Sequence, residues 1–122
     1  MRILKGKTVI AENVEVAESF ASKTLGLMFR KSLPRNSAML FIFDKPGRHG
    51  IWMPFMRFPI DIVFLDSRKR VVGLHSWVRP ISFRNGKTWK VYYSDKPAKY
   101  AIELAAGQVK RKMLQPGERL KF

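Results

Sequence analysis

An acidic side chain inside an apolar strand is the feature of this sequence that most directly suggests chemistry. Asp61 lies within the run 60–65, where its five companions are Ile, Val, Phe or Leu. Because side chains alternate along a strand, Asp61 shares a face with Val63 and Leu65, and both faces are apolar. Desolvating an unpaired carboxylate costs several kcal/mol, so Asp61 needs a partner or must stay protonated.

Two roles for Asp61 follow, and the sequence leaves both open. In the first role, Asp61 specifies the fold through an ion pair or by accepting backbone N–H groups that hold the loop 54–59. In the second role, it is a general acid, a general base or a ligand anchor. We expect Arg30 or Arg57 to neutralise Asp61, because a guanidinium can bind a carboxylate through two N–H groups.

A second carboxylate, Glu103, occupies another apolar strand. Ala101 and Ala105 flank it on its own face, and these small residues leave room for a packed neighbour, a lysine or a ligand. If Asp61 and Glu103 met across one cleft at about 5–10 Å, they would suit acid–base chemistry of the glycosidase type. A carboxylate-based hydrolase or lyase is therefore one alternative, and a structural role for both groups is the simpler one.

A loop rich in aromatic residues and methionine precedes Asp61, framed by Pro54 and Pro59. Such a cluster either joins the core or forms an exposed apolar binding patch, since proline-containing loops tend to lie at the surface. We predict that the loop 52–59 borders a ligand cleft and that the chain is a small binding module rather than an enzyme. The predicted ligand-binding residues are Arg30, Trp52, Phe55, Arg57, Asp61 and Glu103.

The connection 79–99 interleaves cationic and aromatic residues, which is typical of surfaces that bind single-stranded nucleic acid or another polyanion. No recognised nucleic-acid motif accompanies it, and a solvated basic loop whose aromatic rings cover the core would contain the same residues. The polyanion-binding residues that this alternative predicts are Arg79, Arg84, Lys87, Trp89 and Lys90.

The formal net charge of +15 in 122 residues is distributed unevenly. Residues 1–66 contain ten Lys and Arg against six Asp and Glu, whereas residues 67–122 contain fourteen against three. A positive field of this size accelerates association with polyanions. The alternative explanation is that the charge only keeps the protein in solution.

The chain has no cysteine, which excludes disulfides, thiolate metal sites and cysteine nucleophiles. His49 and His75 are its only histidines and match no metal-binding spacing, so we expect no metal and no cofactor. The N-terminus lacks the apolar core of a signal peptide, and no apolar run approaches the ~20 residues of a membrane span. We therefore expect a cytoplasmic protein without a membrane span.

The elements that must position these residues are short strands separated by turn signals, as in a mostly β domain. Ser19 predicts the N-cap of a short helix over residues 20–25, with Gly26 as its left-handed end, and a second short helix is expected over 107–114. We expect a turn at residues 44–47 and strands at residues 3–4, 8–16, 38–43, 50–53, 60–65, 70–77, 89–93, 100–105 and 119–122. We predict a single domain, residues 1–122, folded as a mainly β (α+β) sandwich or partly open barrel of roughly eight short strands.

Five ordered blocks of the sequence resemble a known family. They are Gly26-Leu-Met-Phe-Arg30, Met39-Leu-Phe41, Trp52-Met53, the run 59–66 and the run 100–107. Together they are similar to the domain-of-unknown-function 192 family, also called uncharacterised protein family 0127. The resemblance implies a mostly β, sandwich-like domain and brings no known activity. Where the family usually has a Lys-Asn-Thr run after Trp-Met, this chain has Pro54-Phe55-Met56, so any chemistry of that Asn is missing here.

Overall fold

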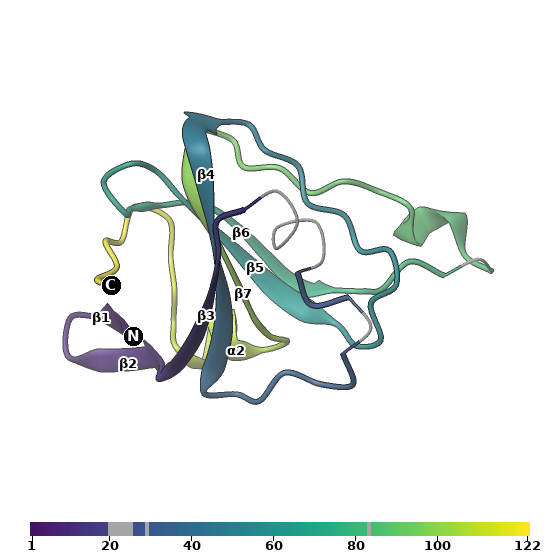
Figure 1. Ribbon diagram of the computed structural model, residues 1–122, viewed down its shortest axis with the longest axis horizontal. Helices are drawn as coiled ribbons and strands as arrows, with labels where there is room; N and C mark the ends of the chain where they lie inside the picture. Colours follow the sequence, from purple (N-terminus) through teal and green to yellow (C-terminus); the bar gives the residue numbers. More distant parts are fainter. Residues whose placement is uncertain (20–25, 29, 83) are drawn as a thin grey trace.

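The described structure, which in this computed structural model comprises residues 1–19, 26–28, 30–82 and 84–122, contains seven strands in two sheets. Two of the strands, β1 (Ile3–Lys5) and β2 (Thr8–Ala11), form an antiparallel hairpin. The other sheet has the strand order β3-β4-β7-β5-β6, in which only β3 and β4 pair in parallel. Its strands are β3 (Asn13–Ala17), β4 (Ser37–Gly47), β5 (Ile60–Leu65), β6 (Val71–Val78) and β7 (Ala98–Ala105). The described helices are η1 (Gly86–Thr88) and α2 (Gln108–Arg111) (Figure 1).

The five-stranded sheet is buried on both faces, because its central strands carry apolar residues on both sides. On one face Leu40, Val63 and Ile102 pack with residues of the β1–β2 hairpin, of α2 and of the C-terminal segment. On the other face, Phe41 and Ile62 pack with residues from the connecting segments, such as Leu27 and Met53. This layered packing confirms the predicted mainly β, sandwich-like α+β fold, and the described strands form no closed barrel.

Several predicted element boundaries differ from the structure. The turn predicted at residues 44–47 is wrong, because β4 continues to Gly47, which pairs with Ala98 after an irregularity in the register. The strands predicted at 50–53, 89–93 and 119–122 are reduced to isolated bridges that involve Ile51–Tyr92, Arg70–Arg119 and Leu4–Lys121.

The helix predicted over 107–114 is shorter, since only Gln108–Arg111 is helical. The helix predicted over 20–25 lies outside the described residues. Gly26 has a φ of +48°, the left-handed conformation that the sequence predicts.

The two chain ends lie together at one end of the molecule's longest axis, on the left of Figure 1. At the opposite end, the connection between β6 and β7 projects beyond the sheet, with η1 in green at its far end (Figure 1). No helix among the described residues is long and apolar enough to span a lipid bilayer.

Candidate functional site

Asp61 is completely buried in β5, and backbone N–H groups satisfy its carboxylate. Its Oδ1 accepts the backbone N–H of Trp77 at 2.9 Å, and its Oδ2 accepts the backbone N–H of Val109 at 2.8 Å. The prediction that Arg30 or Arg57 neutralises Asp61 is therefore wrong. Asp61 accepts backbone N–H groups, as one alternative had it, but these belong to β6 and α2 instead of the loop 54–59.

The Asp61 carboxylate accepts N–H groups from two segments where the backbone is irregular. Trp77 lies opposite a register shift between β5 and β6 and has a φ of +52°. Val109 is in the first turn of α2, whose N-cap residue is Gly107 and has no side chain to cap the helix. Asp61, in β5, therefore supplies the hydrogen-bond acceptor that an N-cap side chain of α2 would otherwise provide.

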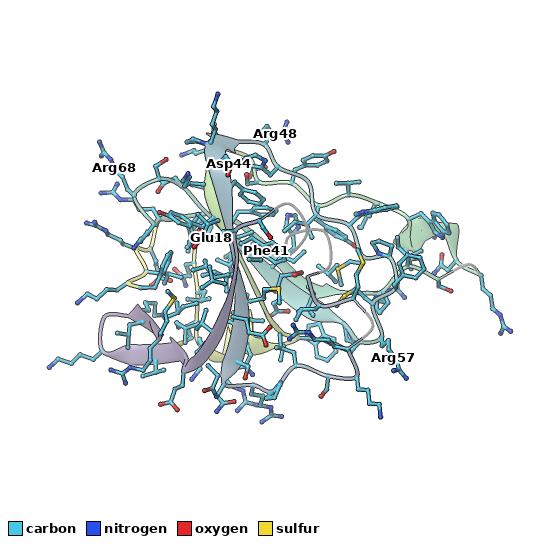
Figure 2. The ribbon with its side chains drawn as sticks, viewed as in Figure 1. Glu18, Phe41, Asp44, Arg48, Arg57 and Arg68 are labelled. Carbon is cyan, nitrogen blue, oxygen red and sulfur yellow. The ribbon has the colours of Figure 1, made fainter. Side chains whose placement is uncertain are left out.

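The two arginines predicted to bind Asp61 lie elsewhere. Nη2 of Arg30 is 2.6 Å from Oε2 of Glu15, and both side chains are substantially exposed. Arg30 lines a surface hollow of about 380 Å³ beside Glu12 and Glu15. Arg57 is exposed and points away from the sheet in Figure 2. Neither arginine is brought to Asp61.

Glu103 lies in the central strand β7, next to Met39 of β4 and Ile62 of β5. Its side chain is only 4% exposed, and burial raises the pKa of the carboxyl from its ordinary value to about 8. Among the described residues, no ion pair or side-chain hydrogen bond involves Glu103. Burial therefore favours the protonated form of this carboxyl, which can both donate and accept a hydrogen bond.

Asp61 and Glu103 lie on opposite faces of the same sheet. Asp61 pairs with Leu104, the neighbour of Glu103, so the alternation of side chains directs the two carboxyls apart. Asp61 also has no exposed surface. The pair predicted for a hydrolase or lyase is thus not brought together in one cleft.

The loop 52–59 is divided between core and surface. Met53 is fully buried on the face that carries Glu103, and Met56 and Phe58 pack against the same cluster. Trp52 and Phe55 are 53% and 62% exposed, and Phe55 has a φ of +59°. Part of this loop therefore joins the core, and another part is exposed at the surface.

The projecting connection contains the basic arm, which we define as residues 79–93 without the undescribed residue 83. Backbone hydrogen bonds of 2.9 and 2.7 Å join Ile51 to Tyr92 in both directions, and the N–H of Ile81 donates to the carbonyl of Met53 at 3.2 Å. Two segments far apart in the sequence therefore support each other along the base of the arm.

Hydrogen bonds within the tip fix its shape. The hydroxyl of Thr88, a buried residue, accepts the N–H of Ser82 and donates to the carbonyl of Asn85, both at 2.7 Å. The indole N–H of Trp89 donates to the carbonyl of Ser82 at 2.9 Å, while half of that side chain stays exposed. The tip therefore presents an aromatic ring in a fixed orientation.

A hollow of about 340 Å³ lies between the basic arm and the end of β6. The cationic side chains that line it are Arg79, Lys87 and Lys90, and none of the described residues that line it is acidic. The other residues lining it are Leu74, His75, Ser76, Trp77, Val78, Thr88 and Tyr92. The ammonium of Lys90 lies 5.1 Å from the centre of the Tyr92 ring. Such a concave basic surface with aromatic walls is suited to a phosphate-bearing ligand.

Three of the five predicted polyanion-binding residues, Arg79, Lys87 and Lys90, therefore line one hollow. Arg84 is exposed at the tip, and Trp89 is half exposed but does not line the hollow. Sequence reasoning missed His75 and Trp77, because both belong to the predicted strand 70–77 and nothing in that pattern separates an exposed strand end from a buried one.

Solved structures related to this chain share its fold. One, from Sinorhizobium meliloti, is named as a candidate transcription regulator; it superposes with a TM-score of 0.80 and 31% identity over 88% of this chain and 79% of that one. Another, a protein of unknown function from Novosphingobium aromaticivorans, has a TM-score of 0.81 and 25% identity over 89% of this chain and 74% of that one.

Sequence relatives and a family model match nearly the whole of this chain. A UPF0127 protein of Pyrococcus furiosus is 35% identical over 127 residues, which cover 100% of this chain and 96% of the relative. A UPF0127 protein of Thermococcus kodakarensis is 32% identical over 107 residues, and the match spans 61% of that relative. The family model DUF192, described as uncharacterized ACR, matches residues 2–122. This chain therefore belongs to the DUF192 family, whose function is unknown.

Proposed function

We propose that the basic arm binds single-stranded nucleic acid. The observation that carries the proposal is the hollow at the base of the arm, where Arg79, Lys87 and Lys90 converge with no acidic residue among the described lining. Clustered cations with neighbouring aromatic rings bind single strands, because the cations neutralise phosphates and the rings stack on bases.

The rigidity of the tip supports this proposal. Lys87 and Trp89 flank Thr88, whose hydroxyl bonds to the backbone on both sides of the tip. A side chain that is fixed before binding loses less conformational freedom when a ligand arrives. A merely solvated basic loop needs no such internal bonding.

The size and charge of the surface agree with a nucleotide-sized ligand. A volume of about 340 Å³ lies near the lower end of the range of ligand pockets, about 300–1,000 Å³. The excess of fourteen cationic over three acidic residues in residues 67–122 would steer a polyanion toward this half of the sequence. The name of the Sinorhizobium meliloti relative as a candidate transcription regulator is in keeping with the same ligand class.

The experiment measures the affinity of a fluorescent oligothymidylate by anisotropy at low salt. Lys87→Ala with Lys90→Ala should weaken binding by about tenfold or more, since each removes a phosphate contact. The matched control is Arg35→Ala with Arg111→Ala, which removes the same charge from a different hollow, lined by Val9–Glu12 and Gln108. Equal losses in the two double variants, or no binding by the unmodified protein, would refute the proposal.

A second candidate function, binding of a neutral ligand beside the loop 52–59, is favoured by one observation. Glu103 is buried and flanked by Ala101 and Ala105 on the face that this loop covers, and burial raises the pKa of its carboxyl to about 8. A protonated carboxyl can donate and accept hydrogen bonds, and the exposed rings of Trp52 and Phe55 could stack on a sugar. Of the residues predicted for this cleft, Asp61 is excluded because it projects to the opposite face of the sheet from Glu103.

This candidate is tested by NMR titration with a neutral trisaccharide such as cellotriose. Shifts of the Trp52 indole resonance that disappear in Glu103→Gln would support it. Spectra unchanged by the sugar at millimolar concentration would remove it.

A further inference from the structure

Trp77 combines an exposed side chain with a left-handed backbone conformation, as Phe55 and Met113 also do. It is 62% exposed at the end of β6, and its φ of +52° lies in the left-handed region. A bulky residue in that region strains the backbone, and glycine or asparagine occupies it with less strain. An exposed position that served only the fold would therefore gain from a smaller residue.

The strained conformation is held from the buried side. Oδ1 of Asp61 accepts the Trp77 N–H at 2.9 Å, while Oδ2 is fixed by the N–H of Val109 at 2.8 Å. The indole lies beside Gly107, where an added Cβ would be 3.7 Å from the indole Nε1. Backbone and ring are thus both located by neighbours, and the outer surface of the ring faces solvent.

Trp77 is one of the residues that line the hollow, together with Arg79, Lys87 and Lys90. We infer that this hollow holds one nucleotide unit, with its base stacked on Trp77 and its phosphate against these three cations. Asp61 is then a positioning residue, which acts through Trp77 without touching the ligand. The inference rests on the proposed function and assigns a specific ring to it.

Two variants separate ring stacking from backbone support. Trp77→Gly and Trp77→Ala both remove the indole, but only glycine relieves the left-handed strain. We expect the Gly variant to melt at the higher temperature, while both variants lose affinity for oligothymidylate equally, by about tenfold. The salt dependence of binding should stay unchanged, because no phosphate contact is removed. Met113→Ala, which removes another exposed side chain from a residue with a positive φ, should leave affinity unaltered.

The role of Asp61 is tested by a double-mutant cycle on affinity. Asp61→Asn should weaken binding in the protein that retains Trp77, and it should have no further effect in the Trp77→Gly background. Equal effects in both backgrounds would mean that Asp61 does not act through Trp77. If Asp61→Asn does not fold, the comparison of the Gly and Ala variants still decides the inference.

The outcomes distinguish this inference from the proposed function. Unchanged affinity in Trp77→Gly, with loss in the Lys87 and Lys90 variant, overturns the stacking role and leaves the basic arm as the binding surface. The stacking role is also overturned if the Trp77 variant with the higher melting temperature binds more tightly. That result would indicate that Trp77 affects binding only through stability. Thymidine monophosphate should bind more weakly than the oligomer and show the same dependence on Trp77. Tighter binding of the monophosphate would assign the hollow to a free nucleotide and overturn the nucleic-acid assignment.

Discussion

Asp61 and Glu103 lie on adjacent strands of one sheet, yet their side chains project to opposite faces. The two buried carboxyl groups also differ in their hydrogen-bond partners. The carboxylate of Asp61 accepts two backbone N–H groups. Glu103 has no ion pair within the described residues, and burial raises the pKa of its carboxyl to about 8. Burial of the same chemical group is therefore accompanied by two hydrogen bonds on one face and by a raised pKa on the other.

Removing the Asp61 carboxylate should destabilise the fold strongly. Asp61→Ala leaves the buried N–H of Val109 and the partly buried N–H of Trp77 without their acceptor, which costs about 2–5 kcal/mol. Urea denaturation measures this loss. Asp66→Ala is the matched control, because Oδ1 of Asp66 also accepts two backbone N–H groups but near solvent. It should cost about 1 kcal/mol or less. Similar costs in the two variants would contradict the structural role of Asp61.

Glu103 should make the protein less stable as the pH rises. Its folded pKa of about 8 exceeds the ordinary value of 4.5, so the folded state binds more protons than the unfolded state between these pH values. The free energy of unfolding therefore falls with rising pH across that window, by at most about 5 kcal/mol. Glu103→Gln should remove this fall. Chemical denaturation of both proteins at pH 5 and pH 8 tests it, and parallel pH profiles would contradict it.

Thr88 should control the order of the tip without supporting the core. Thr88→Val removes the hydroxyl that bonds to Ser82 and Asn85. We expect faster amide hydrogen exchange in the tip and a global stability loss of about 1 kcal/mol or less. Thr8→Val, at an exposed position in β2, is the control. If exchange in the tip stays at the original rate, the tip is held by other contacts.

The sequence predicted the strands best where apolar alternation is uninterrupted. The run 60–65 coincides with β5. Residues 44–47 contain Asp, Lys, Pro and Gly, but pairing of Gly47 with Ala98 extends β4 through them. Tertiary pairing here overrides local turn preference.

The partners of Asp61 had no signal in the sequence. Every residue except proline carries a backbone N–H, so nothing marks Trp77 or Val109 as a donor to a carboxylate 16 or 48 positions away. The opposite orientation of Asp61 and Glu103 depends on the register of β5 against β7, and alternation within one strand does not determine that register. By contrast, three of the five residues predicted in the connection 79–99, namely Arg79, Lys87 and Lys90, do line one hollow.

The salt dependence of oligothymidylate binding tests the central claim most directly. The slope of log K against log salt concentration should be steep for the unmodified protein. For single strands each lost phosphate contact removes about 0.7 from this slope. Lys87→Ala with Lys90→Ala should therefore reduce it by about 1.4, because two contacts are lost. Identical slopes for the two proteins, or affinity that does not respond to salt, would contradict binding through the basic arm.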